Sequence, residues 1–63
     1  MLLYWIYDFE TGEDFFVKAP NKYDALFTAS YYGYETPRFC TVLTDLNKTA
    51  EYPFKVYDYS KIE

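Results

Sequence analysis

Histidine is absent from this chain of 63 residues, cysteine occurs once and glycine only twice. Without histidine the chain lacks the commonest transition-metal ligand and the commonest general base. The single cysteine, Cys40, excludes a disulfide within the chain and has no histidine to activate it as a nucleophile. Two isolated glycines, Gly12 and Gly33, cannot supply a glycine-rich phosphate loop. We therefore expect a protein that is not an enzyme and that holds no cofactor and no metal ion.

Long apolar runs and clustered positive charge are also missing. The apolar N-terminal run 1–7 is followed by Asp8, whereas a helix needs ~20 apolar residues to cross a bilayer. No basic segment or cleavage site of a secretory signal accompanies this run, so we expect a cytoplasmic protein that makes no use of a membrane. The net charge of −4, with lysine and arginine spread along the chain, makes nucleic acid an unfavourable partner.

Aromatic side chains are what the sequence has in abundance. Nine Tyr, six Phe and one Trp make up 25% of the residues, and each ring buries on the order of 150–250 Å² when it packs. A chain this short buries only about 60% of its unfolded surface, so some rings are expected at the surface, where they favour association. Residue types with AT-rich codons outnumber those with GC-rich codons, which favours a bacterial or phage source.

The positions of glycine, proline and β-branched residues divide the single predicted domain, 1–63, into five elements. Asn21 is a good helix N-cap, Gly33 suits the position after a helix, and Pro37 blocks any continuation. The predicted fold class is α+β, a two-layer β-β-α-β-β arrangement with one helix on a small, mostly antiparallel sheet. The predicted strands are 2–9, 14–19, 38–44 and 52–59, the helix is 22–32 and a loop covers 45–51.

The first two predicted strands form a hairpin whose register can be tested on the sequence. A three-residue turn at 10–12 pairs Phe9 with Glu13 and sets Asp8 opposite Asp14, an unfavourable contact of like charges. This register gathers apolar residues on one face of the sheet. A slip by one residue would move every side chain of one strand to the opposite face. The expected helix-facing set is Leu3, Trp5, Tyr7, Phe15, Val17 and Ala19, with Tyr4, Ile6, Asp8, Asp14, Phe16 and Lys18 on the other face.

The predicted helix has two apolar sides. At 100° per residue, Ala25, Leu26 and Ala29 share one side, together with Tyr32 and Gly33, whereas Tyr23, Phe27 and Tyr31 lie on the opposite side. Small residues allow close approach to a sheet, so we expect the alanines to face inward and the rings to face outward. Such rings mark a protein-binding surface. The predicted binding residues are Tyr23, Phe27, Tyr31 and Tyr34; the other interpretation is that neighbouring segments cover this stripe.

Acidic residues are densest around the predicted hairpin turn, at Asp8, Glu10, Glu13 and Asp14. The simplest interpretation is a solvated turn that discourages edge-to-edge pairing. A calcium loop does not fit, because Gly12 stands where an oxygen ligand belongs. The alternative function is an acidic mimic of nucleic acid, in which these four carboxylates contact a basic groove of a partner.

Two further expectations concern the sheet. Tyr4 and Phe16 with Lys18 are placed on one face, where they would stack the bases of single-stranded nucleic acid, a third functional alternative. Cys40 lies in the middle of a predicted strand and is expected to be a buried, inert thiol.

These observations favour a small acidic protein without catalytic activity that binds another protein through an exposed aromatic helix face. An inhibitor or regulator of a host protein, from a phage or mobile element, is the form predicted, and a homodimer would use the same rings.

Overall fold

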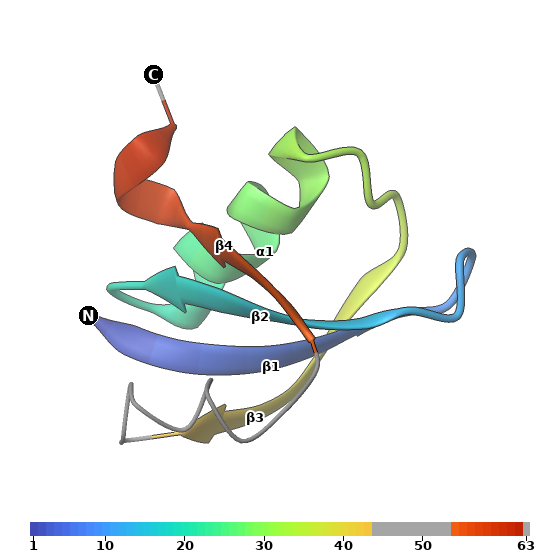
Figure 1. Cartoon of the computed structure of the whole chain (residues 1–63), viewed down its shortest axis with the longest axis horizontal. Coiled ribbons are helices and arrows are strands. Elements are labelled where there is room, and N and C mark those ends of the chain that lie inside the picture. Colours follow the sequence, from blue (N-terminus) through green and yellow to red (C-terminus); the bar gives the residue numbers. More distant parts are fainter. Residues whose placement is uncertain (44–53, 63) are drawn as a thin grey trace.

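The computed structural model describes residues 1–43 and 54–62. It consists of a four-stranded sheet with one α-helix packed on one face (Figure 1). The elements, in chain order, are β1 (Leu2–Asp8), β2 (Asp14–Ala19), α1 (Lys22–Tyr31), β3 (Pro37–Leu43), β4 (Lys55–Asp58) and the 3-10 helix η2 (Tyr59–Lys61). The predicted loop at 45–51 and the predicted strand start at 52 and 53 lie outside the described residues. The α+β class is confirmed.

The sheet has the strand order β3-β1-β2-β4 and is mixed. β1 pairs antiparallel with both β2 and β3, whereas β4 runs parallel to β2. The predicted, mostly antiparallel arrangement therefore holds only in part. β4 occupies one edge of the sheet and β3 the other.

The hairpin register differs from the predicted one by a single residue. Tyr7 pairs with Asp14 and Ile6 pairs with Phe15, and the N–H of Asp8 donates to the carbonyl of Glu13 over 2.9 Å. The predicted contact between Asp8 and Asp14 is therefore absent from this pairing. The shift turns β1 over, so Leu3, Trp5 and Tyr7 lie on the face away from the helix, contrary to the prediction.

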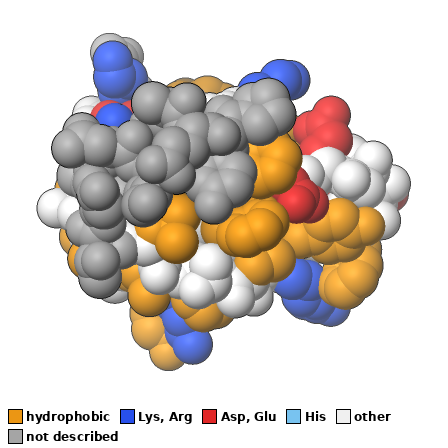
Figure 2. Space-filling model, turned by 60° about the horizontal axis from the view of Figure 1, so that its bottom comes forward, with side chains coloured by type: hydrophobic (Ala, Val, Ile, Leu, Met, Phe, Trp, Pro, Cys, Tyr) orange, Lys and Arg blue, Asp and Glu red, His pale blue; other side chains and the backbone are white. Residues whose placement is uncertain are grey.

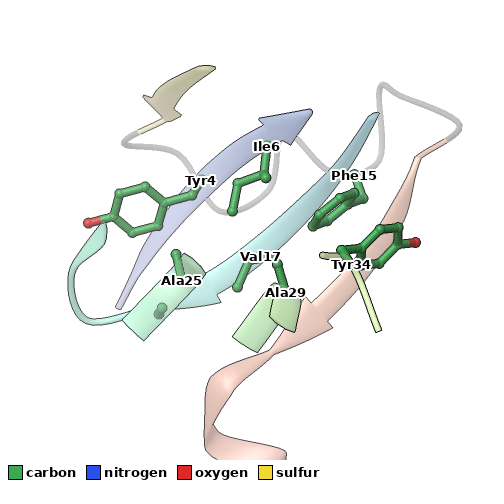
Figure 3. Close-up of a cluster of buried hydrophobic side chains, with 8 residues drawn as sticks. Tyr4, Ile6, Phe15, Val17, Ala25, Ala29 and Tyr34 are labelled. Atoms are coloured by element: carbon green, nitrogen blue, oxygen red, sulfur yellow. The ribbon is translucent and has the colours of Figure 1, made fainter. Parts of the chain in front are cut away.

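The main core lies between α1 and the sheet, where β1 and β2 contribute alternate residues and α1 contributes its small ones (Figure 3). The stacked rings of Phe15 and Tyr34, 4.1 Å apart, close one end of this core. Ala25 and Ala29 are fully buried against the strands. Because their side chains are small, the helix can approach the sheet closely. The buried members are Tyr4, Ile6, Phe15, Val17, Ala19, Ala25, Ala29 and Tyr34.

The opposite face of the sheet is apolar as well. Leu3 and Phe16 are fully buried there, and Trp5, Phe16 and Phe54 form a ring cluster with centroid distances of 5.4–6.5 Å. Figure 2 shows hydrophobic side chains gathered on this side of the molecule. β1 therefore carries apolar residues on both faces, and alternation alone cannot orient it.

The ends of α1 follow the predicted signals. The side chain of Asn21 accepts from the N–H of Asp24 over 2.9 Å, which satisfies one of the free donors of the first turn. At the other end Gly33 has φ +100°, a conformation that glycine adopts without strain. The N–H of Gly33 donates to Ser30 and that of Tyr34 to Ala29, the bonding pattern of a Schellman cap. Local sequence thus fixes the limits of the helix.

Candidate protein-binding surface

The outward side of α1 carries the three rings that the sequence placed there. Tyr23 is 75% exposed, and Phe27 and Tyr31 are each 55% exposed. On the inward side, Ala25, Thr28 and Ala29 are buried. The predicted orientation of the helix is confirmed. Binding through these rings stays a prediction.

A fourth ring, Tyr32, joins this surface although the sequence assigned it to the inward side. Tyr32 is 41% exposed, packs edge-on against Tyr31 at 5.1 Å and lies 4.6 Å from the ring of Tyr57 on β4. Its backbone N–H still donates to the carbonyl of Thr28, as in the helix, and its ring lies between those of Tyr31 and Tyr57, so it borders both sides of α1. Lys22 lies 5.7 Å from the centroid of Tyr23 at the other end. We call Tyr23, Phe27, Tyr31 and Tyr32 the helix-face surface.

Tyr34, which was predicted to extend the exposed stripe, is only 6% exposed. Its ring stacks on Phe15, and its hydroxyl donates to Oε2 of Glu13 at 2.8 Å and lies 2.9 Å from the hydroxyl of Tyr57. Burial, together with these hydrogen bonds to Tyr57 and Glu13, raises the pKa of Tyr34 well above its ordinary value. Tyr34 therefore belongs to the core, because the Schellman cap turns the chain back toward the sheet.

Asp8, predicted to be a surface acid, is fully buried. Its carboxylate accepts from the N–H of Thr11 at 2.9 Å, from the N–H of Thr36 at 3.0 Å and from the hydroxyl of Thr36 at 3.3 Å. Burial alone would raise the pKa of this carboxyl, but the hydrogen bonds from Thr11 and Thr36 outweigh it and hold the pKa below its ordinary value. Asp8 thus ties the hairpin turn to the segment before β3 and is not accessible to a partner.

The remaining hairpin acids, Glu10, Glu13 and Asp14, differ in whether their carboxylates accept hydrogen bonds within the chain. Glu13 is exposed but accepts from Tyr34, and Asp14 accepts from Nε1 of Trp5 at 3.2 Å. Glu10 is exposed. Acidic and hydrophobic side chains lie side by side at this end of the molecule (Figure 2). Here Phe9 is 62% exposed, contacts Tyr7 at 5.2 Å and lies 5.6 Å from the guanidinium of Arg38.

The predicted base-stacking platform on the sheet is wrong. Tyr4 points toward α1 with Val17, its partner across the strands, whereas Phe16 lies on the other face. Both rings are also nearly or fully buried, at 4% and 0% exposure. The one-residue shift of the hairpin separates the two rings.

Cys40 is exposed, contrary to the expectation of a buried thiol. It lies in the segment of β3 where the pairing with β1 shifts, between the partners of Trp5 and Ile6. Partial burial of the sulfur and the negative charge of Asp14 raise the pKa of the thiol, despite a hydrogen bond from the backbone of Tyr7. The raised pKa keeps Cys40 in its less reactive, protonated form at neutral pH.

Pockets and metal-ligand clusters are two further kinds of site that the described ranges can be searched for. Residues 1–43 and 54–62 form no pocket and no cluster of three or more side chains suited to a metal ion. In the same ranges no helix combines the length and the apolar character needed to cross a membrane. No family model, curated protein or solved structure matches the chain.

Proposed function

We propose that this chain is a protein-binding module without catalytic activity and that its contact surface is the helix-face surface. The observation that carries the proposal is the exposure of Tyr23, Phe27 and Tyr31, each more than half accessible to solvent. Contiguous exposed rings are uncommon on a monomeric protein and mark interaction sites. Tyrosine also suits this role, because its ring buries a large area while its hydroxyl stays hydrated.

The surface is pre-organised for binding. α1 is capped at both ends, and its inward residues Ala25 and Ala29 are locked against the sheet. Tyr31 and Tyr32 pack against each other, and Tyr32 is further held by Tyr57. Side chains that are already ordered lose less conformational entropy when a partner binds.

The role that we propose is an inhibitor or regulator that acts in the cytoplasm by covering a surface of another protein. The small size of the chain and its composition support a bacterial or phage origin. The acidic alternative has less support, since Asp8 is buried, and both Glu13 and Asp14 accept hydrogen bonds within the chain. Nucleic-acid mimicry needs carboxylates that are free to face a partner.

The test compares capture of proteins from a bacterial lysate by the wild type and by the double variant Phe27→Ser plus Tyr31→Ser. Both positions are exposed on the outward side of α1, so the variant is expected to keep its fold, which circular dichroism checks. We expect the variant to lose the partners that the wild type retains. The control variant Glu10→Gln plus Glu13→Gln should keep them; equal capture by a folded double variant would refute the proposal.

A further inference from the structure

We infer that the partner of the helix-face surface is a second copy of this chain, bound helix to helix in an antiparallel, two-fold symmetric contact centred on Phe27. This inference rests on the proposed function, because it takes the same surface to be a binding surface. A second copy and a foreign protein would use the same rings, so a foreign protein would bind by displacing the second copy from this weak dimer. Three observations support the inference: the spacing of the rings, the charge of the helix and the exposed area.

The spacing of the rings makes the surface complementary to itself. Tyr23 lies four residues before Phe27 and Tyr31 lies four residues after it, so reversing the direction of the helix exchanges one tyrosine for the other. A two-fold contact requires that the same patch serve both copies. With Phe27 beside the symmetry axis, Tyr23 of each copy lies at the level of Tyr31 of the other. Residues four apart form the ridges that commonly interlock when two helices pack.

Charge does not oppose this contact, although each copy carries a net charge of −4. Within α1 the only charged residues are Lys22 and Asp24, which cancel. The acids Glu10, Glu13 and Asp14 lie at the hairpin instead. An antiparallel contact also sets the N-terminus of each helix beside the C-terminus of the other, which is the favourable arrangement of two helix dipoles.

The exposed area agrees with a small dimer interface. At about 200 Å² for a whole ring, the exposed fractions of the four rings correspond to roughly 450 Å² per copy. This is about a tenth of the 4122 Å² surface of the molecule, the share that a small protein commonly gives to an interface. Two copies together approach the ~1,000 Å² that a specific interface needs, with Lys22, Asp24 and Ser30 beside the rings. We therefore expect weak to moderate affinity.

The decisive experiment uses opposite charges at position 27. Sedimentation equilibrium from about 1 μM to about 1 mM covers the range in which small interfaces associate. We expect the wild type to dimerise and the variants Phe27→Lys and Phe27→Glu to be monomers, because each sets like charges together at the axis. An equimolar mixture of the two variants is expected to form a heterodimer. A wild type that stays monomeric throughout overturns the inference, as does a folded pair of variants that fails to associate when mixed.

A cross-linking measurement keeps the test decisive if a charged variant does not fold. In a Cys40→Ser background, Phe27→Cys should form a covalent dimer rapidly under a mild thiol oxidant such as diamide, because the two sulfurs would meet at the axis. Val56→Cys in the same background is the matched control, since Val56 is also exposed, at 41%, but lies on β4 and away from the outward side of α1. Equal rates for the two variants would contradict the inferred contact.

The results also separate this inference from the proposed function. A monomeric wild type that captures a foreign protein, and loses it on Phe27→Ser plus Tyr31→Ser, removes the second copy but keeps the binding surface. A monomeric wild type whose capture is unchanged by that double variant removes both.

Discussion

Asp8 and Tyr34 are buried polar side chains whose hydrogen bonds join the hairpin to the rest of the molecule. Asp8 reaches across 28 positions of the sequence to Thr36, and Tyr34 reaches across 21 positions to Glu13. Each is buried and each has its polar atoms satisfied. A buried polar group is costly when its partner is lost, so these residues are expected to be sensitive to substitution.

The first prediction concerns Asp8 and acid. The pKa of Asp8 in the folded chain lies below its ordinary value of 3.8. Its contribution to stability is therefore complete above about pH 4 and is lost as the pH falls through the folded-state pKa. We expect Asp8→Asn to lower the free energy of unfolding at pH 7 and to flatten its decline below pH 4, measured by urea unfolding at several pH values.

The control for Asp8→Asn is Glu10→Gln, which removes an exposed carboxylate from the same hairpin. It should leave the free energy of unfolding at pH 7 nearly unchanged. If Asp8→Asn were as stable as the wild type at neutral pH, the hydrogen bonds from Thr11 and Thr36 would not be what holds the turn.

The second prediction concerns the hydroxyl of Tyr34. Tyr34→Phe keeps the ring that stacks on Phe15 but removes the hydrogen bonds to Glu13 and Tyr57. Since Glu13 is exposed and can be hydrated again, we expect a loss of about 1 kcal/mol in the free energy of unfolding. Tyr34→Ala, which also removes the ring, should cost roughly 3–5 kcal/mol. Equal losses for the two variants would show that the ring contributes nothing.

At the scale of the elements, α1 and β1 differ in how far their own residues determine which face of the element turns toward the core. α1 has small residues on one side and large rings on the other, so only one orientation allows the helix to approach the sheet closely. β1 has Leu3 buried on one face and Ile6 buried on the other, so both orientations bury apolar area. Its orientation depends instead on the turn, where Asp8 binds Thr11 and Thr36.

The third prediction tests the close approach of α1 to the sheet. Ala29 is fully buried, whereas Ser30 beside it is exposed. Ala29→Leu inserts extra volume into a filled core and should lower the free energy of unfolding by about 1–3 kcal/mol. Ser30→Leu introduces the same side chain one position further and should be nearly neutral, since leucine is a good helix former. Chemical unfolding of the two variants would measure the difference, and a well-tolerated Ala29→Leu would argue against tight packing there.

At the scale of the whole molecule, the small size of the chain leaves little stability to lose. At ~0.05–0.15 kcal/mol per residue, a chain of 63 residues has a free energy of unfolding of roughly 3–9 kcal/mol. The main core joins β1, β2, α1 and Tyr34. The loss of one central ring is therefore comparable with the stability of the entire fold.

The fourth prediction follows from this narrow margin. Phe15 is fully buried and contacts both Tyr34 and Tyr57, so Phe15→Ala should cost about 3–5 kcal/mol. We expect a variant that has lost about half or more of its stability, seen as loss of near-ultraviolet circular dichroism at a much lower urea concentration than in the wild type. Phe27→Ala removes the same ring from the outward side of α1, and at micromolar concentration it should stay folded. Two variants with the same stability would refute the assignment of core and surface.

The outcomes for individual residues show which kinds of prediction the sequence supports. Asn21 and Gly33 were correctly predicted as helix limits, and Ala25, Ala29 and the three outward rings were correctly oriented. Tyr34 and Asp8 were placed at the surface but are buried. The two groups differ in the range of the contacts that decide them, because caps and helix faces depend on residues within one or two turns.

By itself, the sequence determined the α+β class, the limits of α1 and the direction in which its alanines and rings point. Local hydrogen bonds and the helical period are sufficient to fix these features. Only the tertiary structure decided the orientation of β1, the parallel placement of β4 and the burial of Asp8 and Tyr34. Each of these features depends on partners far away along the chain, such as Thr36 for Asp8. β1 is apolar on both faces, so its own residues give no signal that could choose between its two possible orientations.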